Sequence, residues 1–78
     1  MRLLILLAKD SKQNFLIKLH TEELVKEIKE LINKRNHSKA IKVALSKGKL
    51  EKRIAKREIG NIDADAVLTK DKVIWNLK

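Results

Sequence analysis

Residues 21–35, Thr-Glu-Glu-Leu-Val-Lys-Glu-Ile-Lys-Glu-Leu-Ile-Asn-Lys-Arg, carry the clearest structural pattern in the chain. From Leu24 onward, apolar residues recur at i, i+1, i+4, i+7 and i+8, which is the spacing that lines one face of an α-helix. Thr21 is a suitable N-cap, and Glu22 and Glu23 stand near the positive end of the helix dipole. The pattern therefore predicts an amphipathic helix over 21–35 with one buried face.

Two apolar segments precede this helix. Residues 3–8 are apolar without alternation, as in a strand that is covered on both faces. Phe15, Ile17 and Leu19 stand at alternate positions, as in a half-buried strand. The polar, turn-prone residues between the two segments connect them, so the N-terminus is predicted to form a β-hairpin.

The segment after the first helix, 39–59, favours one or two further helices. Residues 40–45 place apolar side chains on one face of a short helix capped by Ser38, although 41–45 also alternate as a strand would. We prefer the helix. Residues 49–59 favour helix throughout, and Gly60 follows as a stop signal, so a further helix is predicted there.

Near the C-terminus, residues 66–69 and 73–77 flank a polar turn and predict a second β-hairpin. The whole chain, 1–78, is therefore expected to be one small α+β domain. If 41–45 is a helix the arrangement is winged-helix-like, and if it is a strand the sheet is β-grasp-like and packs on the helix at 21–35.

Residues 40–59 also resemble the generic helix-turn-helix pattern. Ala44, Gly48 and Ile54 stand where that motif has a small residue, a turn glycine and a buried aliphatic residue. Lys49 and Arg57 depart from the pattern, because they occupy positions that are normally apolar. With the C-terminal hairpin as a wing, the resemblance implies a winged-helix-like DNA-binding fold.

The formal charge of +9 is concentrated in one part of the chain. Residues 37–59 hold eight Lys/Arg and two acidic residues, a net charge of +6, whereas 60–78 are neutral. A helix over 49–59 would place five cations within an arc of about 140°. The candidate contacts to phosphate are Lys47, Lys49, Lys52, Arg53, Lys56 and Arg57, to which Lys39 and Lys42 add positive field.

This basic face predicts a small nucleic-acid-binding module that contacts the phosphates of DNA or RNA. The alternative is a protein-interaction module, an adaptor or inhibitor, that docks an acidic partner or pairs through a sheet edge. A merely solvated lysine-rich helix would carry the same residues. The small core also leaves room for stabilisation by self-association, so a homo-oligomer is a further option.

Nothing in the sequence predicts catalysis or a cofactor. The chain has no cysteine and no glycine-rich phosphate loop, so we expect no enzyme activity. His20 and His37 lack a second ligand at metal-binding spacing, so no metal site is expected. Phe15 and Trp75, the only aromatic residues, are expected in the core. No apolar run approaches the roughly 18 residues of a membrane span, and we expect a cytoplasmic protein with no membrane partner.

Overall fold

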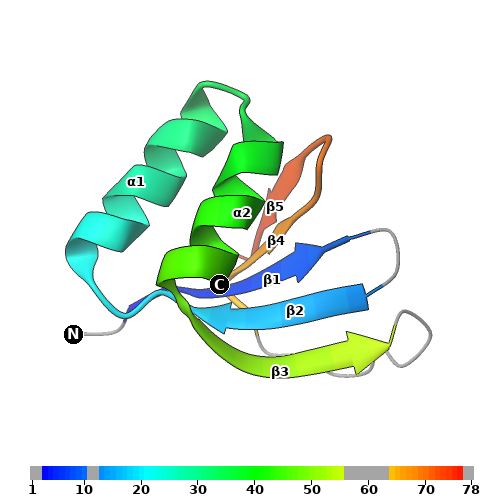
Figure 1. The fold of residues 1–78 in the computed structure, drawn as a ribbon. Helices are drawn as coiled ribbons and strands as arrows, with labels where there is room; N and C mark the ends of the chain where they lie inside the picture. The colour runs from blue at the N-terminus through cyan, green and yellow to red at the C-terminus, as the bar shows by residue number, and fades with distance from the viewer. Residues whose placement is uncertain (1–2, 11–12, 56–63, 77–78) are drawn as a thin grey trace.

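The computed structural model describes residues 3–10, 13–55 and 64–76, which form two helices packed on a five-stranded sheet (Figure 1). In chain order the elements are β1 (Ile5–Lys9), β2 (Gln13–Lys18), α1 (Glu22–Asn33), α2 (His37–Lys47), β3 (Lys49–Ala55), β4 (Ala66–Leu68) and β5 (Val73–Trp75). The predicted α+β class is confirmed.

The strands follow the order β3-β2-β1-β4-β5 across the sheet. β1 pairs antiparallel with β2 and parallel with β4, and β4 pairs antiparallel with β5. Both predicted hairpins are therefore confirmed. The uninterrupted apolar run at the N-terminus is explained by the central place of β1, where Leu6, Leu7 and Ala8 are all buried.

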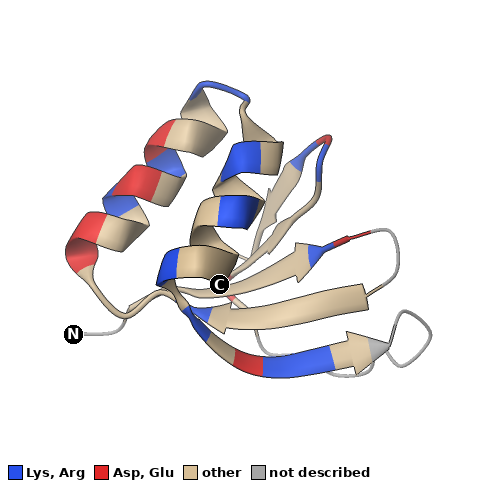
Figure 2. Ribbon diagram, viewed as in Figure 1, with Lys and Arg blue, Asp and Glu red and all other residues tan. Residues whose placement is uncertain are grey.

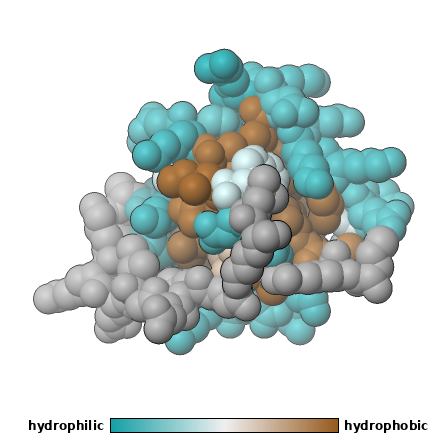
Figure 3. Space-filling view, turned by 180° about the vertical axis from the view of Figure 1, so that it is seen from behind, coloured by the Kyte–Doolittle hydropathy of each residue, from teal (hydrophilic) through white to brown (hydrophobic). Residues whose placement is uncertain are grey.

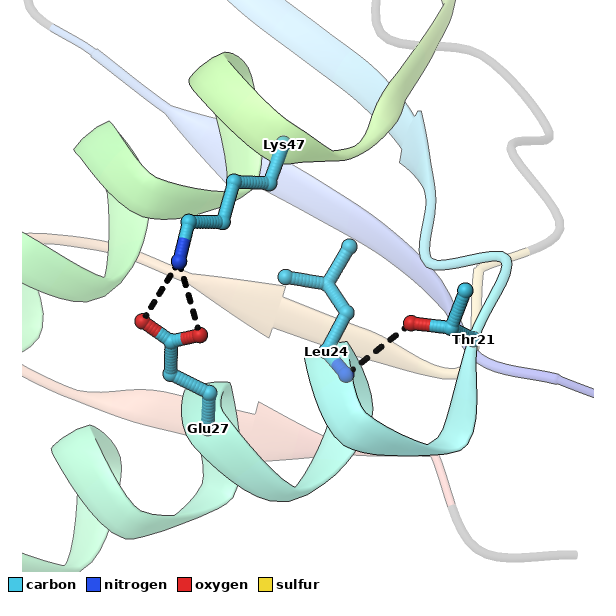
Figure 4. A network of polar contacts seen from close by, with 4 residues as sticks. All are labelled: Thr21, Leu24, Glu27 and Lys47. Atoms are coloured by element: carbon cyan, nitrogen blue, oxygen red, sulfur yellow. Dashed lines mark hydrogen bonds and ion pairs between the residues drawn. The ribbon is translucent and has the colours of Figure 1, made fainter.

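Helix α1 forms because its cap and its apolar face both favour it. The Thr21 hydroxyl oxygen accepts a hydrogen bond of 3.1 Å from the Leu24 N–H (Figure 4), which satisfies one of the unpaired donors at the helix start. Leu24, Ile28 and Ile32 are buried against the sheet. The predicted helix is confirmed, and the structure ends it at Asn33, two residues before the predicted end.

The end of α1 is set by a backbone motif that the sequence pattern did not predict. Arg35 adopts a left-handed conformation with φ of 61°. Its N–H donates to the Ile32 carbonyl, and the Asn36 N–H donates to the Leu31 carbonyl, both at 2.9 Å. This is the hydrogen-bonding pattern of a Schellman motif, in which the left-handed position is usually glycine.

Residues 41–45 lie within helix α2, so the predicted short helix is confirmed, and the prediction of a strand at 41–45, which the β-grasp-like alternative requires, is wrong. The predicted cap at Ser38 is also wrong, because the helix begins at His37 and Asn36 occupies the N-cap position. The buried side of α2 consists of His37, Ala40, Ile41 and Ala44. Ala40 and Ala44 are small, so the helix can pack close to the sheet.

The predicted helix at 49–59 is wrong over 49–55, which form strand β3 instead. Gly48 ends α2 at a point of very close approach: a Cβ built there would lie 2.6 Å from the Ala44 carbonyl oxygen and 2.7 Å from Ile17 Cγ2. The chain therefore leaves the helix beside β2 and pairs along it. Helix propensities differ by only about 0.7 kcal/mol per residue among ordinary residues, so strand pairing and burial of Ile54 outweigh them.

The helix-turn-helix resemblance fails for the same reason. Gly48 joins a helix to a strand and does not connect two helices, so no recognition helix follows it at 49–55. Ala44 and Ile54 are buried as that pattern required, but they belong to a helix and a strand of different layers. Residues 56–59, the remainder of the predicted helix, lie outside the described residues.

The helices cover one face of the sheet; in Figure 1 they lie above β1, β2 and β3, and α2 passes in front of β4 and β5. The core joins Leu6, Ala8, Ile17, Ala66 and Leu68 of the strands to the apolar sides of α1 and α2. Phe15 and Trp75, which were expected in the core, are partly buried and pack against it. None of the helices among the described residues is long and apolar enough to cross a membrane.

The other face of the sheet, here called the outer face, carries a second apolar row. Cross-strand pairing aligns Leu16 of β2, Leu7 of β1, Val67 of β4 and Ile74 of β5. Lys52 of β3 pairs with Leu16 and ends the row on one side. Viewed from behind, apolar side chains gather in the middle of the surface with hydrophilic ones around them (Figure 3).

Candidate nucleic-acid interface

The segment formed by α2 and β3 differs in charge from helix α1. Residues 37–55, which comprise α2 and β3, contain six Lys/Arg and one acidic residue, a net charge of +5. Residues 22–33, which form α1, contain two lysines and four glutamates, a net charge of −2. Blue segments accordingly recur along α2 and on both sides of a red segment in β3 in Figure 2, whereas α1 alternates red and blue. The positive charge thus belongs to the side of the molecule built by α2 and β3.

Strand β3 distributes its cations over both faces of the sheet. Residues that stand opposite one another in paired strands project to the same face. Lys52 pairs with Leu16 and so belongs to the outer face, whereas Arg53 pairs with Phe15 and belongs to the helix-covered face. The predicted helical arc of five cations is therefore wrong for the residues described, and Lys56 and Arg57 lie outside them.

Strand pairing creates a cluster of cations on the outer face. Lys49 stands directly opposite Lys18 of β2, and Lys52 follows on the same face after a bulge in the pairing. We call Lys18, Lys49 and Lys52 the lysine cluster; all three side chains are exposed. Like charges directly opposite each other destabilise a sheet, and among the described residues no carboxylate forms an ion pair with any of the three.

Lys47 is directed toward α1 and away from this cluster. Its ammonium lies 3.2 and 3.3 Å from the two carboxylate oxygens of Glu27 (Figure 4). The side chains are 59% and 40% exposed, so the pair contributes less than about 1 kcal/mol to stability. Of the predicted contacts, Lys49 and Lys52 thus share a surface, whereas Arg53 lies on the other face of the same edge strand. Lys47 is separated from them by its pairing with Glu27.

The outward side of α2 adds two cations. Lys39 and Lys42 are exposed and stand three residues apart, which places them on one side of the helix. The buried stripe of α2 faces the opposite way. These lysines therefore contribute to the positive field of the α2 and β3 side, as predicted, but they lie in the helix layer and do not join the lysine cluster.

Lys18 is the residue of the cluster that the sequence analysis missed. It lies 31 residues before Lys49 in the chain and belongs to a different segment of the charge count. The only signal in the sequence was its place at an exposed position of an alternating strand. Its importance depends on the pairing register of β2 with β3, which no local pattern specifies.

The two histidines have different surroundings, and Asp65 has a structural role. His37 is buried on the core side of α2, and His20 is exposed. An Asp65 carboxylate oxygen accepts a 2.8 Å hydrogen bond from the Ile5 N–H, which ties the start of β4 to that of β1. No group of three or more metal-ligating side chains occurs within 3–10, 13–55 and 64–76.

No protein-family model matches the chain, and neither the search of curated proteins nor that of solved structures gave a match.

Proposed function

We propose that this protein binds nucleic acid through its phosphates, with the lysine cluster as the principal contact and Arg53 as a flanking one. The observation that carries the proposal is the direct pairing of Lys18 with Lys49, with Lys52 on the same face. Each of these lysines repels the others in the free protein. A bound polyanion removes that repulsion, so part of the binding free energy comes from relief of an unfavourable arrangement.

The geometry suits a phosphate backbone better than a single small anion. Along β3, Lys49 and Lys52 are three residues apart, which corresponds to at most about 10 Å of extended strand. Lysine ammonium groups act as mobile point charges, so they accept phosphates over a range of positions. Arg53 differs, because its guanidinium group can hold one phosphate through two hydrogen bonds.

Base stacking is not the expected source of affinity. The two aromatic side chains, Phe15 and Trp75, pack against the core on the helix-covered side of the sheet. Binding should therefore tolerate many sequences and depend strongly on salt.

Fluorescence anisotropy with labelled duplex and single-stranded oligonucleotides, over a series of salt concentrations, tests this proposal. We assume that each of the three lysines of the cluster, and Arg53, neutralises one phosphate. A plot of log Kd against log salt concentration should then have a slope of magnitude about 3.6 on duplex DNA and about 2.8 on single strands. A variant that combines Lys18→Gln, Lys49→Gln and Lys52→Gln should lower the magnitude of the slope on duplex DNA by about 2.7.

The matched control combines Lys26→Gln, Lys34→Gln and Lys70→Gln. It removes the same net charge from exposed positions away from the cluster, so a general charge effect would lower the slope equally in both variants. Equal losses, or no binding of the unaltered protein at low salt, would contradict the proposal. The competing ligand is an acidic protein surface, which would leave the purified protein free of nucleic acid. The chain has one Trp and no Tyr, so its absorbance ratio reveals co-purified nucleic acid readily.

A further inference from the structure

The two edges of the sheet differ in charge. At one edge, β3 exposes Lys49, Glu51, Lys52 and Arg53, and charged side chains of this kind block pairing with another strand. At the other edge, β5 consists of Val73, Ile74 and Trp75 and carries no charge. Ile74 is 47% exposed, the highest value among the large hydrophobic residues described. The edge at β5 is short, but it lacks the charged side chains that block pairing at the edge formed by β3.

The hydrogen bonds of the β4–β5 hairpin show which backbone groups are free at this edge. The Thr69 N–H donates to the Lys72 carbonyl and the Asn76 N–H to the Asp65 carbonyl, both at 2.9 Å. Because hydrogen-bonded pairs alternate along an antiparallel ladder, the next such pair is Val67 with Ile74. The N–H and C=O groups of Val73 and Trp75 consequently point away from β4, toward the outer side of the edge.

This arrangement is complementary to itself. We propose that two copies of the chain pair antiparallel through β5, about a two-fold axis at Ile74. In that register Val73 of each copy stands opposite Trp75 of the other, and the four outward N–H groups meet the four outward C=O groups. Ile74 stands opposite Ile74 of the second copy as a non-hydrogen-bonded pair, in which the Cα atoms are about 4.5 Å apart. The apolar rows of the two outer faces then form one continuous row.

The distribution of charge favours a second copy at this edge despite the large positive charge of the chain. Residues 64–76 contain two aspartates and two lysines and are neutral. In the proposed register Lys72 stands opposite Asn76 of the second copy, so no like charges face each other there. The lysine cluster reaches β3, four strand spacings or about 19 Å from β5. The two clusters therefore lie near opposite ends of the joined sheet, where their repulsion is screened.

Analytical ultracentrifugation of the full chain without nucleic acid, from micromolar to millimolar protein, tests the pairing. We expect a reversible dimer, and Ile74→Lys should raise its dissociation constant at least tenfold, because it places two ammonium groups at the axis. Val73→Pro removes an outward N–H without touching the bonds to β4 and should have the same effect. Far-UV circular dichroism verifies that both variants fold. A monomer at every concentration, or a dimer that survives both substitutions, would show the inference to be wrong.

A single cysteine tests the register. The chain has no cysteine, so oxidation of Ile74→Cys can link only position 74 to position 74 of a second copy. A Cα separation of about 4.5 Å falls within the range of roughly 4.4–6.8 Å that a disulfide spans. We expect a covalent dimer to form much faster than for Leu50→Cys, a matched variant at a 38% exposed position on the opposite edge. Equal rates would refute the register. These results do not depend on nucleic-acid binding, since the lysine-cluster variant should dimerise as the unaltered chain does.

Discussion

Gly48→Ala offers a direct test of how α2 joins β3. The Cβ of alanine would lie 2.6 Å from the Ala44 carbonyl oxygen and 2.7 Å from Ile17 Cγ2, whereas ordinary contacts begin at 3.4 Å. Neither neighbour can easily retreat. The Ala44 carbonyl already accepts the Gly48 N–H at 2.8 Å, and Ile17 is fully buried. The φ of −82° at Gly48 is accessible to alanine, so the cost comes from packing alone.

The expected magnitude follows from two opposing effects. Overpacking of this kind destabilises a protein by about 1–3 kcal/mol. The smaller conformational entropy of alanine in the unfolded chain stabilises the folded protein by about 0.4–1 kcal/mol. The net loss in free energy of unfolding should be about 1–2 kcal/mol. For a chain of this size it corresponds to a decrease in Tm of about 4–16 °C.

Urea and thermal unfolding, followed by far-UV circular dichroism, measure this loss. Ser46→Ala is the matched control, because Ser46 is exposed on the same helix, and its effect should stay within about 0.5 kcal/mol. The sign of the change in stability distinguishes the two cases. Replacing a glycine by alanine at an uncrowded position stabilises a protein, so an unchanged or raised stability of Gly48→Ala would refute the close approach of α2 to β2.

Two further substitutions test the ends of α1. Arg35→Gly should stabilise the protein by about 0.5–1 kcal/mol, because glycine adopts the left-handed conformation at this position without strain; a decrease in Tm would contradict the Schellman motif. Thr21→Ala should destabilise it by about 1 kcal/mol through loss of the hydrogen bond to the Leu24 N–H, whereas Thr21→Ser should retain the stability, and equal losses in both variants would argue against the cap.

Patterns local in sequence predicted the elements whose partners lie nearby. Helix α1 followed from its cap and apolar spacing, and the two hairpins followed from paired apolar segments around polar turns. Residues 49–55 were mispredicted because Lys, Leu, Glu and Arg favour a helix only weakly, and nothing local reports that β2 offers an unpaired edge.

The candidate site likewise combines features that local sequence predicts with features that depend on strand pairing. Charge counting located the basic segment, because net charge is a property of composition alone. Charge counting did not identify Lys18. The predicted helix placed Lys49, Lys52 and Arg53 on one face, which is wrong because a helix and a strand distribute side chains with different periods.

Composition and periodicity thus determined the class of fold, the amphipathic helix, both hairpins and the part of the chain that carries the charge. Tertiary structure decided that 49–55 are a strand, which face each cation occupies, and that β5 is an edge. The physical reason is the range of the interactions involved. Caps, helical faces and tight turns depend on residues within a few positions of one another, whereas strand register and edge position depend on residues far apart in the chain.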